Sequence, residues 1–475
     1  MAYCILKSYK LRLKPFAIFR AFKDRKNCFF LDSSLNADYS LGRYSFLGIE
    51  PFHTLEVNKS GPFDKLRGLL DRYRISLPQG NPPFLGGAVG YLSYDLGFML
   101  EEKLKPQPKP DTQIPGCLFA FYNSAVIIDH LKNTLYIFSC GFPETRYAAA
   151  RLLAERNFKK TFRLLDEVAG TEDRDELKDG PGHSSISSNF TKEDYLAAVK
   201  RAKEYIKAGD IYQVNLSQQF RAKSDLCTFG IYQRLRRLSP SYFGAYFDAG
   251  DFQILSSSPE RFLKVEGDTV ITRPMKGTRP CPLNTTMKKK FRGQLLQSAK
   301  DKAELTMIVD LERNDLGRVC SYDSVRVLRL RELEEYSTVF QTTATVCGRL
   351  HKDRDSIDLL RACFPGGSIT GCPKIRAMEI IEELEPGRRG IYTGCLGYFS
   401  FSGPMEFNIL IHSILKRNNE LCFGAGGGIV ADSVAEEEYN ETLVKAAAMA
   451  KAIGARDTLS FSWKSVPALA GRVSP

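Results

Sequence analysis

Apolar and polar positions alternate along much of the chain with the two-residue period of β-strands. Residues 125–129 and 134–139 form two such runs on either side of a polar turn, which predicts a pair of adjacent strands. Residues 144–160 instead repeat apolar side chains at helical spacing and predict a helix. Another helix is predicted to begin at Thr191, because Asp194 stands three positions later and gives a capping-box-like start.

The C-terminal part of the chain mixes both kinds of element. Residues 390–402 and 405–415 are rich in β-branched and aromatic residues, with turn signals between them, and predict antiparallel strands. Pro373 suits the first position of a helix that continues as IRAMEIIEELE. A last helix is predicted to begin at Asp432 and Ser433, with Glu436 three residues after the serine.

One break in composition divides the chain. Residues 166–188 are polar and rich in glycine and serine, with few apolar side chains to bury, and predict a flexible linker. The linker separates an N-terminal region, residues 1–165, from a C-terminal region, residues 189–455. Residues 456–475 are expected to form a disordered tail.

Composition and charge exclude several classes of protein. At 43% hydrophobic and 26% charged residues over 475 positions, the chain is typical of globular proteins. It shows neither an apolar run of the ~18 residues needed to span a membrane nor a signal peptide, so we expect a cytoplasmic location and no membrane association. The net charge of +12 is dispersed, which favours anionic small molecules over nucleic acid. The twelve cysteines include no Cys-x-x-Cys spacing, so a zinc site is not expected.

Two short acidic pairs are candidates for a metal site. Asp301 and Glu304 lie three positions apart in a helical pattern, as do Glu438 and Glu441, so each pair shares one helix face. Four carboxylates brought together would repel one another unless a cation lay between them, and Mg²⁺ suits such an all-oxygen site. Lys445 would extend the second face. From spacing alone, two solvated acidic faces are the more common interpretation.

Two glycine-rich segments could bring the backbone close to a ligand. The segment 364–374, FPGGSITGCPK, leads into a helix N-terminus, whose backbone N–H groups can bind an anion. A plain tight turn is the alternative. The segment 424–430, GAGGGIV, requires close approach to a ligand or to another strand.

A lysine stands in the polar segment 273–280, RPMKGTRP. Lys276 lies between a strand-like run and a glycine turn, and could act as a nucleophile if it were desolvated. By itself, a surface charge is the more common interpretation of such a lysine.

Taken in order, these segments resemble the chorismate-utilising enzymes, a family that includes anthranilate synthase component I, aminodeoxychorismate synthase component I, isochorismate synthases and salicylate synthases. The resemblance extends over residues 189–454, and more loosely over the N-terminal region through residues 31–35, 41–48 and 83–96. The strongest motifs are AGDIYQVNLSQ (208–218), SSSPERF (256–262), RPMKGTRP (273–280), AELTMIVDLERNDLGRVC (303–320), FPGGSITGCPKIRAMEIIEELEP (364–386) and GAGGGIVADSVAEEEYNETLVKA (424–446).

The resemblance implies an α+β fold in which two large antiparallel β-sheets pack as a sandwich with helices on the outside. It also implies Mg²⁺, with Glu304 and Glu441 as ligands and Asp301 and Glu438 around them. The ion would hold the ring carboxylate of chorismate. The residues expected to bind the substrate are Gln213, Thr278, Gly366, Gly367, Ser368, Thr370, Lys374, His412, Gly426, Gly427, Gly428 and Lys445.

A few positions indicate the branch of the family. Water-adding members carry a lysine base where this chain has Gln213, which argues against isochorismate and salicylate synthesis. Lys276 is typical of the aminodeoxychorismate branch, where anthranilate synthases usually carry alanine. Glu260 matches the residue proposed to protonate the departing hydroxyl, which requires a raised pKa. The chain departs from the usual FNIAIRT at His412, where an arginine would hold a carboxylate bidentately.

The expected function is therefore amination of chorismate at C4 to give aminodeoxychorismate. The sequence shows no glutaminase-like segment, so a separate glutamine amidotransferase subunit is expected to supply ammonia in a heterodimer. Two alternatives stay open, an anthranilate synthase component I and a non-catalytic binding protein. The segments 31–35 and 41–48 resemble the part of the family that can hold tryptophan, so tryptophan is a possible further ligand.

Overall fold

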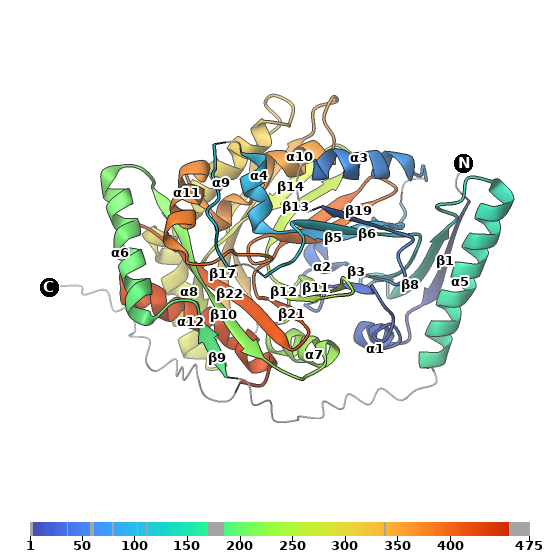
Figure 1. Cartoon of the computed structure of the whole chain (residues 1–475), viewed down its shortest axis with the longest axis horizontal. Helices are drawn as coiled ribbons and strands as arrows, with labels where there is room; N and C mark the ends of the chain where they lie inside the picture. The colour runs from blue at the N-terminus through green and yellow to red at the C-terminus, as the bar shows by residue number, and fades with distance from the viewer. Residues whose placement is uncertain are drawn as a thin grey trace.

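A computed structural model describes residues 3–455, apart from 36, 58–60, 78–79, 102, 111, 170–184 and 337–338. Its core is two large antiparallel sheets (Figure 1). In the described residues the first sheet runs in the order β1 (Cys4–Lys10), β8 (Thr134–Cys140), β7 (Ser124–Asp129), β3 (Tyr44–Gly48), β2 (Phe29–Asp32), β11 (Phe243–Asp248), β12 (Gln253–Ser258), β21 (Ser413–Arg417), β22 (Glu420–Ile429), β10 (Gln213–Lys223) and β18 (Gly371–Cys372), with β9 (Ile186–Ser188) also on β10.

The second sheet is built in the same way from strands that are distant in sequence. In the described part of the chain its order is β15 (Met275–Pro280), β17 (Val339–Arg349), β14 (Thr269–Arg273), β13 (Arg261–Glu266), β20 (Met405–Ile409), β19 (Cys395–Ser400), β5 (Gly87–Leu92), β6 (Cys117–Tyr122) and β4 (His53–Val57), with β16 (Arg326–Glu335) on β17. Each sheet therefore takes strands from both sides of the linker.

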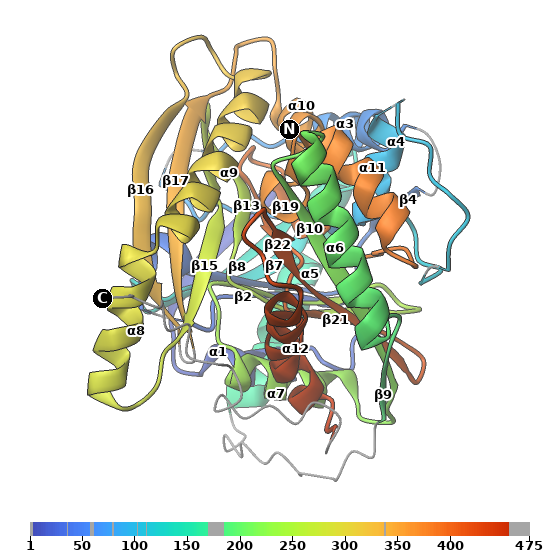
Figure 2. The same cartoon turned by 90° about the vertical axis from the view of Figure 1, so that its left-hand side faces the viewer.

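Helices surround the sheets (Figures 1 and 2). They are α1 (Pro15–Arg20), α2 (Tyr39–Gly42), α3 (Pro62–Arg72), α4 (Gly97–Leu100), α5 (Tyr147–Ala169), α6 (Lys192–Ala208), α7 (Thr228–Leu238), α8 (Thr285–Gln297), α9 (Ala299–Gly317), α10 (Ser356–Cys363), α11 (Lys374–Leu384) and α12 (Ala435–Ala452), with short 3₁₀ turns at Tyr94–Leu96 and Gly367–Ile369. None of the described helices is long and apolar enough to cross a bilayer.

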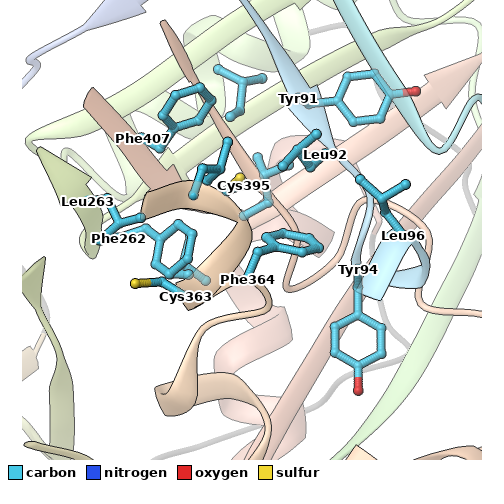
Figure 3. Close-up of a cluster of buried hydrophobic side chains, with 14 of the residues drawn as sticks. Tyr91, Leu92, Tyr94, Leu96, Phe262, Leu263, Cys363, Phe364, Cys395 and Phe407 are labelled. Atoms are coloured by element: carbon cyan, nitrogen blue, oxygen red, sulfur yellow. The ribbon is translucent and has the colours of Figure 1, made fainter. Parts of the chain in front are cut away.

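The two sheets pack face to face through aromatic side chains. Phe46 on the first sheet contacts Tyr398 on the second, with ring centroids 5.3 Å apart, and both side chains are buried. Figure 3 shows part of this core, including Phe262, Phe364 and Phe407. The expected α+β sandwich with external helices is confirmed, because residues in strands bury alternate faces against one another while helices cover the outer faces.

The local predictions were confirmed where neighbouring residues decide the structure. Strands β7 and β8 lie where the alternation placed them, and Thr191 caps α6 by accepting a hydrogen bond from the Asp194 N–H at 3.1 Å. Helix α5 occupies Tyr147–Ala169, so it begins and ends later than predicted and enters the proposed linker. Most of that linker, and the tail at 456–475, lie outside the described residues.

Three element boundaries were wrong. The strand predicted over residues 405–415 is two strands, β20 and β21, because His412 between them takes a left-handed conformation with φ 52°. Helix α12 begins at Ala435 and not at Asp432, because Ser433 turns its hydroxyl to Glu438 at 2.6 Å and accepts from the Val430 N–H. Helix α11 begins at Lys374, so Pro373 is its cap residue and not its first helical residue.

Candidate active site

Strands β10 and β22 form the floor of the candidate site. A Cβ added to Gly428 would lie 2.2 Å from Nε2 of Gln213, and one on Gly426 would lie 2.7 Å from the Leu216 carbonyl oxygen. The close approach of the β10 backbone therefore requires glycine at 426, whereas at 428 a side chain would displace the amide of Gln213. Gly427 faces the other way, where a Cβ would lie 3.2 Å from Glu438 and 3.4 Å from Glu441.

Helix α9 turns a stripe of acids inward. Asp301 is buried and paired with Arg279 at 2.9 Å, while Glu304 lies one turn later on the same face. The Lys300 ammonium lies 3.9 Å from Glu304 and 3.8 Å from Glu438 on α12. The two acidic pairs predicted from spacing are thus brought to one region, from two different helices.

Helix α12 supplies a second charged pair. Lys445 binds Glu441 at 2.7 Å and donates to the Gly426 carbonyl oxygen at 2.9 Å. Burial and the neighbouring Glu441 charge raise the pKa of Glu438. Burial acts in the same direction on Glu441, but Lys445 outweighs it and the pKa of Glu441 is lowered.

The chemistry of these donors fits a hard divalent cation. Within the residues that the structure describes, no three acidic, histidine or cysteine side chains converge closely enough to hold a metal by themselves. Mg²⁺ commonly needs only one or two carboxylates, because water and substrate oxygens complete its shell. Glu304 and Glu438 already face one shared cation, the Lys300 ammonium, so carboxylates from α9 and α12 can meet at a positive charge.

Lys276 lies at the centre of the charged groups. Its ammonium donates to the Ser368 carbonyl oxygen at 2.9 Å, and the charges of Glu304 and Glu260 both act on it. Burial lowers the pKa of Lys276, although these carboxylates oppose the shift. Burial raises the pKa of Glu260 to about 7, against opposing effects of Ser368 and Lys276. A carboxylic acid that is protonated near neutral pH thus lies beside an amine that is easier to deprotonate than usual.

The turn at Gly367–Ile369 packs tightly on α9. A Cβ on Gly367 would lie 2.9 Å from Leu311, and Thr370 donates to the Gly366 carbonyl oxygen at 2.9 Å. Lys374 is directed away from this turn: its ammonium binds Asp315 at 2.6 Å and the Cys363 carbonyl oxygen at 3.0 Å. The predicted turn therefore lies at the site, but Lys374 forms a buried ion pair with Asp315.

Several buried polar atoms at the site lack a protein partner. Both amide atoms of Gln213, Oδ1 of Asn215 and Nδ1 of His412 have no hydrogen-bond partner among the described residues. Burial and the nearby Lys445 charge lower the pKa of His412 to about 4, so its imidazole is neutral. Thr278, the remaining candidate, lies on β15 and accepts from Gln341 at 3.4 Å. Unpaired buried polar atoms are costly, and a polar ligand would satisfy them.

The sequence did not indicate Arg389, which connects the elements of the site. Its guanidinium donates to Glu385, the residue directly after α11, to the Ile369 carbonyl oxygen at 2.9 Å and to the Asn215 carbonyl oxygen at 2.8 Å. The Tyr94 ring lies 4.6 Å from it. The only signal in the sequence was the dipeptide 388–389, which is no different from other basic pairs.

A second cavity lies between the sheets near the N-terminal strands. Its volume is about 1060 Å³, and its lining includes Asp32, Ser33, Tyr44 and Phe46 from the two segments linked to tryptophan binding. Arg261 also lines it, one residue after Glu260.

Comparisons with known proteins agree with this geometry. A family model described as chorismate binding enzyme matches residues 26–451. The chain is 38% identical to anthranilate synthase component 1 of Thermus thermophilus, over 86% of this chain and 89% of that protein. It is 40% identical to aminodeoxychorismate synthase component 1 of Salmonella typhimurium, over 78% of this chain and 77% of that protein. The crystal structure of anthranilate synthase component I from Streptococcus pneumoniae superposes with a TM-score of 0.75 at 31% identity, covering 86% of this chain and 92% of that one.

The fold and the matched residues define the class of protein. The chain belongs to the chorismate binding enzyme family. Its relatives are divided between two activities, both of component 1 of a synthase. It is thus a chorismate-utilising enzyme.

Proposed function

We propose that the chain is the aminating component of an aminodeoxychorismate synthase, which replaces the 4-hydroxyl of chorismate with an amino group. The observation that carries this proposal is Lys276, a half-buried amine whose pKa is lowered, near a carboxyl whose pKa is raised to about 7. The relative in Salmonella typhimurium that bears this name supports the same activity.

The proposed chemistry uses two successive allylic displacements. The neutral amine of Lys276 attacks C2 of chorismate while Glu260 protonates the departing 4-hydroxyl, which leaves as water. Ammonia then attacks C4, and the bond between C2 and Lys276 breaks, so the ring double bonds return to their first positions. The new C4 ammonium carries the positive charge, and Glu260 regains a proton from solvent before the next turnover. Dividing one substitution into two steps in this way is a common use of a lysine nucleophile.

The remaining candidates would bind and orient the substrate. The unpaired atoms of Gln213 and His412 face no protein partner among the described residues and are available to chorismate. The turn containing Gly366, Gly367, Ser368 and Thr370 would hold carboxylate oxygens. Mg²⁺, held by Glu304 and Glu441 with Glu438 and Asp301 around it, would supply positive charge for the ring carboxylate.

Two partners follow from the same proposal. Ammonia would be delivered by a separate glutamine amidotransferase, because the relatives are named as component 1 of their synthases. Tryptophan would occupy the cavity near the N-terminal strands, where Tyr44 and Phe46 offer aromatic contacts. A cytoplasmic location is part of the proposal.

An anthranilate synthase component I is the second candidate. It is favoured by the relative in Thermus thermophilus and by the solved structure from Streptococcus pneumoniae, both of which carry that name. The two activities differ in the carbon that receives nitrogen, so identification of the product separates them.

The test is to trap the lysine adduct. With chorismate and no ammonia, a substrate-derived mass should appear on the peptide that contains Lys276, as measured by mass spectrometry. Lys276→Ala should abolish both that mass and C4 amination, whereas the control Lys289→Ala, at an exposed lysine of α8, should change neither. Near-normal formation of aminodeoxychorismate by Lys276→Ala would exclude the nucleophile role.

A further inference from the structure

Glu312 is a buried acid that the proposed chemistry does not use. It lies on the inward face of α9, two turns beyond Glu304, and only 7% of its surface is exposed. Asp301 and Asp315 on the same face are paired with Arg279 and Lys374. Glu312 has no basic partner among the residues that the structure describes.

The hydrogen bonds of Thr272 determine the protonation of Glu312. The Thr272 hydroxyl lies 2.6 Å from the Phe262 carbonyl oxygen and 2.8 Å from Oε2 of Glu312. A hydroxyl has one hydrogen, and both the Phe262 carbonyl oxygen and an ionised carboxylate can only accept, so an ionised Glu312 would leave one of the two contacts without a hydrogen. Two oxygens 2.8 Å apart without a hydrogen between them would repel. Both contacts are therefore hydrogen bonds at the same time only if Glu312 is protonated and donates to Thr272.

Glu312 also lies next to the candidate general acid. A Cβ on Gly367 would lie 3.7 Å from Cγ of Glu312, and Glu260 is the first of the charged groups that act on Glu312. Burial raises the pKa of Glu312 well above its usual value, and the charge of Glu260 raises it further. Two buried carboxyls whose charges act on each other cannot both ionise at moderate cost.

The same contact fixes the backbone that carries Glu260. Phe262 follows Glu260 by two residues on β13, and its ring packs on Phe364 with centroids 6.4 Å apart (Figure 3). The chain of bonds from Glu312 through Thr272 to the Phe262 carbonyl oxygen ties α9 to β14 and β13. These bonds hold helix α9 in a fixed position relative to β13, the strand that begins directly after Glu260.

We propose that Glu312 is a permanently protonated positioning residue, which donates a hydrogen bond to Thr272 and stays uncharged beside Glu260. The inference rests on the proposed role of Glu260 as general acid. An ionised Glu312 would oppose the ionisation of Glu260 and raise its pKa further. Glu260 would then be too weak an acid to protonate the departing hydroxyl near neutral pH. Asp315, Lys374 and Cys363 also face Glu312, but Lys374 is bound to Asp315 and to the Cys363 carbonyl oxygen, so it does not neutralise Glu312.

The proposal predicts that the amide replaces the acid and that a shorter acid does not. Glu312→Gln keeps a donor at the same position, so kcat should stay within about twofold of wild type and should fall at the same alkaline pH. Glu312→Asp withdraws the donor by one methylene, and Thr272→Val removes the acceptor. Each should lower kcat about tenfold with little change in KM, while Thr272→Ser should retain activity.

Infrared difference spectra provide a readout that does not depend on turnover. Subtracting the spectrum of Glu312→Gln from that of wild type removes the bands of the other protonated acids, and the remaining carbonyl stretch of Glu312 should persist from about pH 6 to about pH 9. Loss of that band as pH rises through this range, or a loss of kcat in Glu312→Gln as large as in Glu312→Asp, would overturn the proposal. If the band persists while the product is anthranilate, the proposed function fails and the protonation of Glu312 stands.

Discussion

Replacing the candidate general acid should make the protein more stable as it makes the enzyme less active. Glu260 is 4% exposed, and burial raises its pKa from 4.5 to about 7. The folded protein therefore binds this proton more tightly than the unfolded chain does. Wild type consequently loses stability as pH rises through that range, because the buried carboxyl must ionise. Glu260→Gln has the shape of the protonated acid and cannot ionise.

The magnitude follows from the difference between the two pKa values. Each pH unit is worth about 1.4 kcal/mol, so the free energy of unfolding of Glu260→Gln should exceed that of wild type by about 3 kcal/mol above pH 7. The advantage should be absent below about pH 4.5, where both side chains are neutral, and should grow between these limits. Such a gain is typical of active-site groups held in unfavourable surroundings.

Urea unfolding across the pH range measures this difference. The control is Glu266→Gln at the C-terminal end of β13, whose partner is Lys264 and whose side chain is 56% exposed. It should change stability by no more than about 0.5 kcal/mol. A Glu260→Gln variant with the same stability as wild type at alkaline pH would refute the reasoning, because Glu260 would then ionise without penalty. Turnover of the variant should be lost at every pH.

Three further substitutions test the site. Glu441→Gln should lower turnover by orders of magnitude and weaken Mg²⁺ activation, because it removes a carboxylate and the partner of Lys445; full activity at ordinary Mg²⁺ would exclude a metal site here. His412→Arg should keep or improve chorismate affinity, since a bidentate fork replaces a neutral ring, whereas a large fall in kcat/KM would show that the pocket is built around histidine. Arg389→Met should cost about 3–5 kcal/mol in urea unfolding by leaving Glu385 unpaired, and a change below 1 kcal/mol would contradict its role as a connector.

The sequence predicted best what neighbouring residues decide. Thr191 and Asp194 form a helix start by themselves, so the pattern was sufficient. Ser433 and Glu436 follow the same pattern, but Ser433 bonds to Val430 and Glu438, so the helix begins later. Tertiary contacts there outweigh the local signal.

The order of strands and the partners of the site residues depend on distant contacts. Arg389 joins Asn215, 174 residues away, to Ile369 and Glu385, and no local pattern predicts such a connection. The sequence predicted that Lys374 binds an anionic substrate. In the structure its ammonium is paired with Asp315, 59 residues away in sequence. Motif resemblance indicated which residues gather, and only the fold shows which of them remain free to bind a ligand.

The most direct test of the central claim is the product formed by the isolated chain from chorismate, Mg²⁺ and an ammonium salt. Separation by liquid chromatography with mass detection distinguishes nitrogen at C4 from nitrogen at C2. The proposed role of Lys276 predicts 4-amino-4-deoxychorismate, formed without anthranilate. Anthranilate as the product would contradict it and would assign the chain to the other activity found among its relatives.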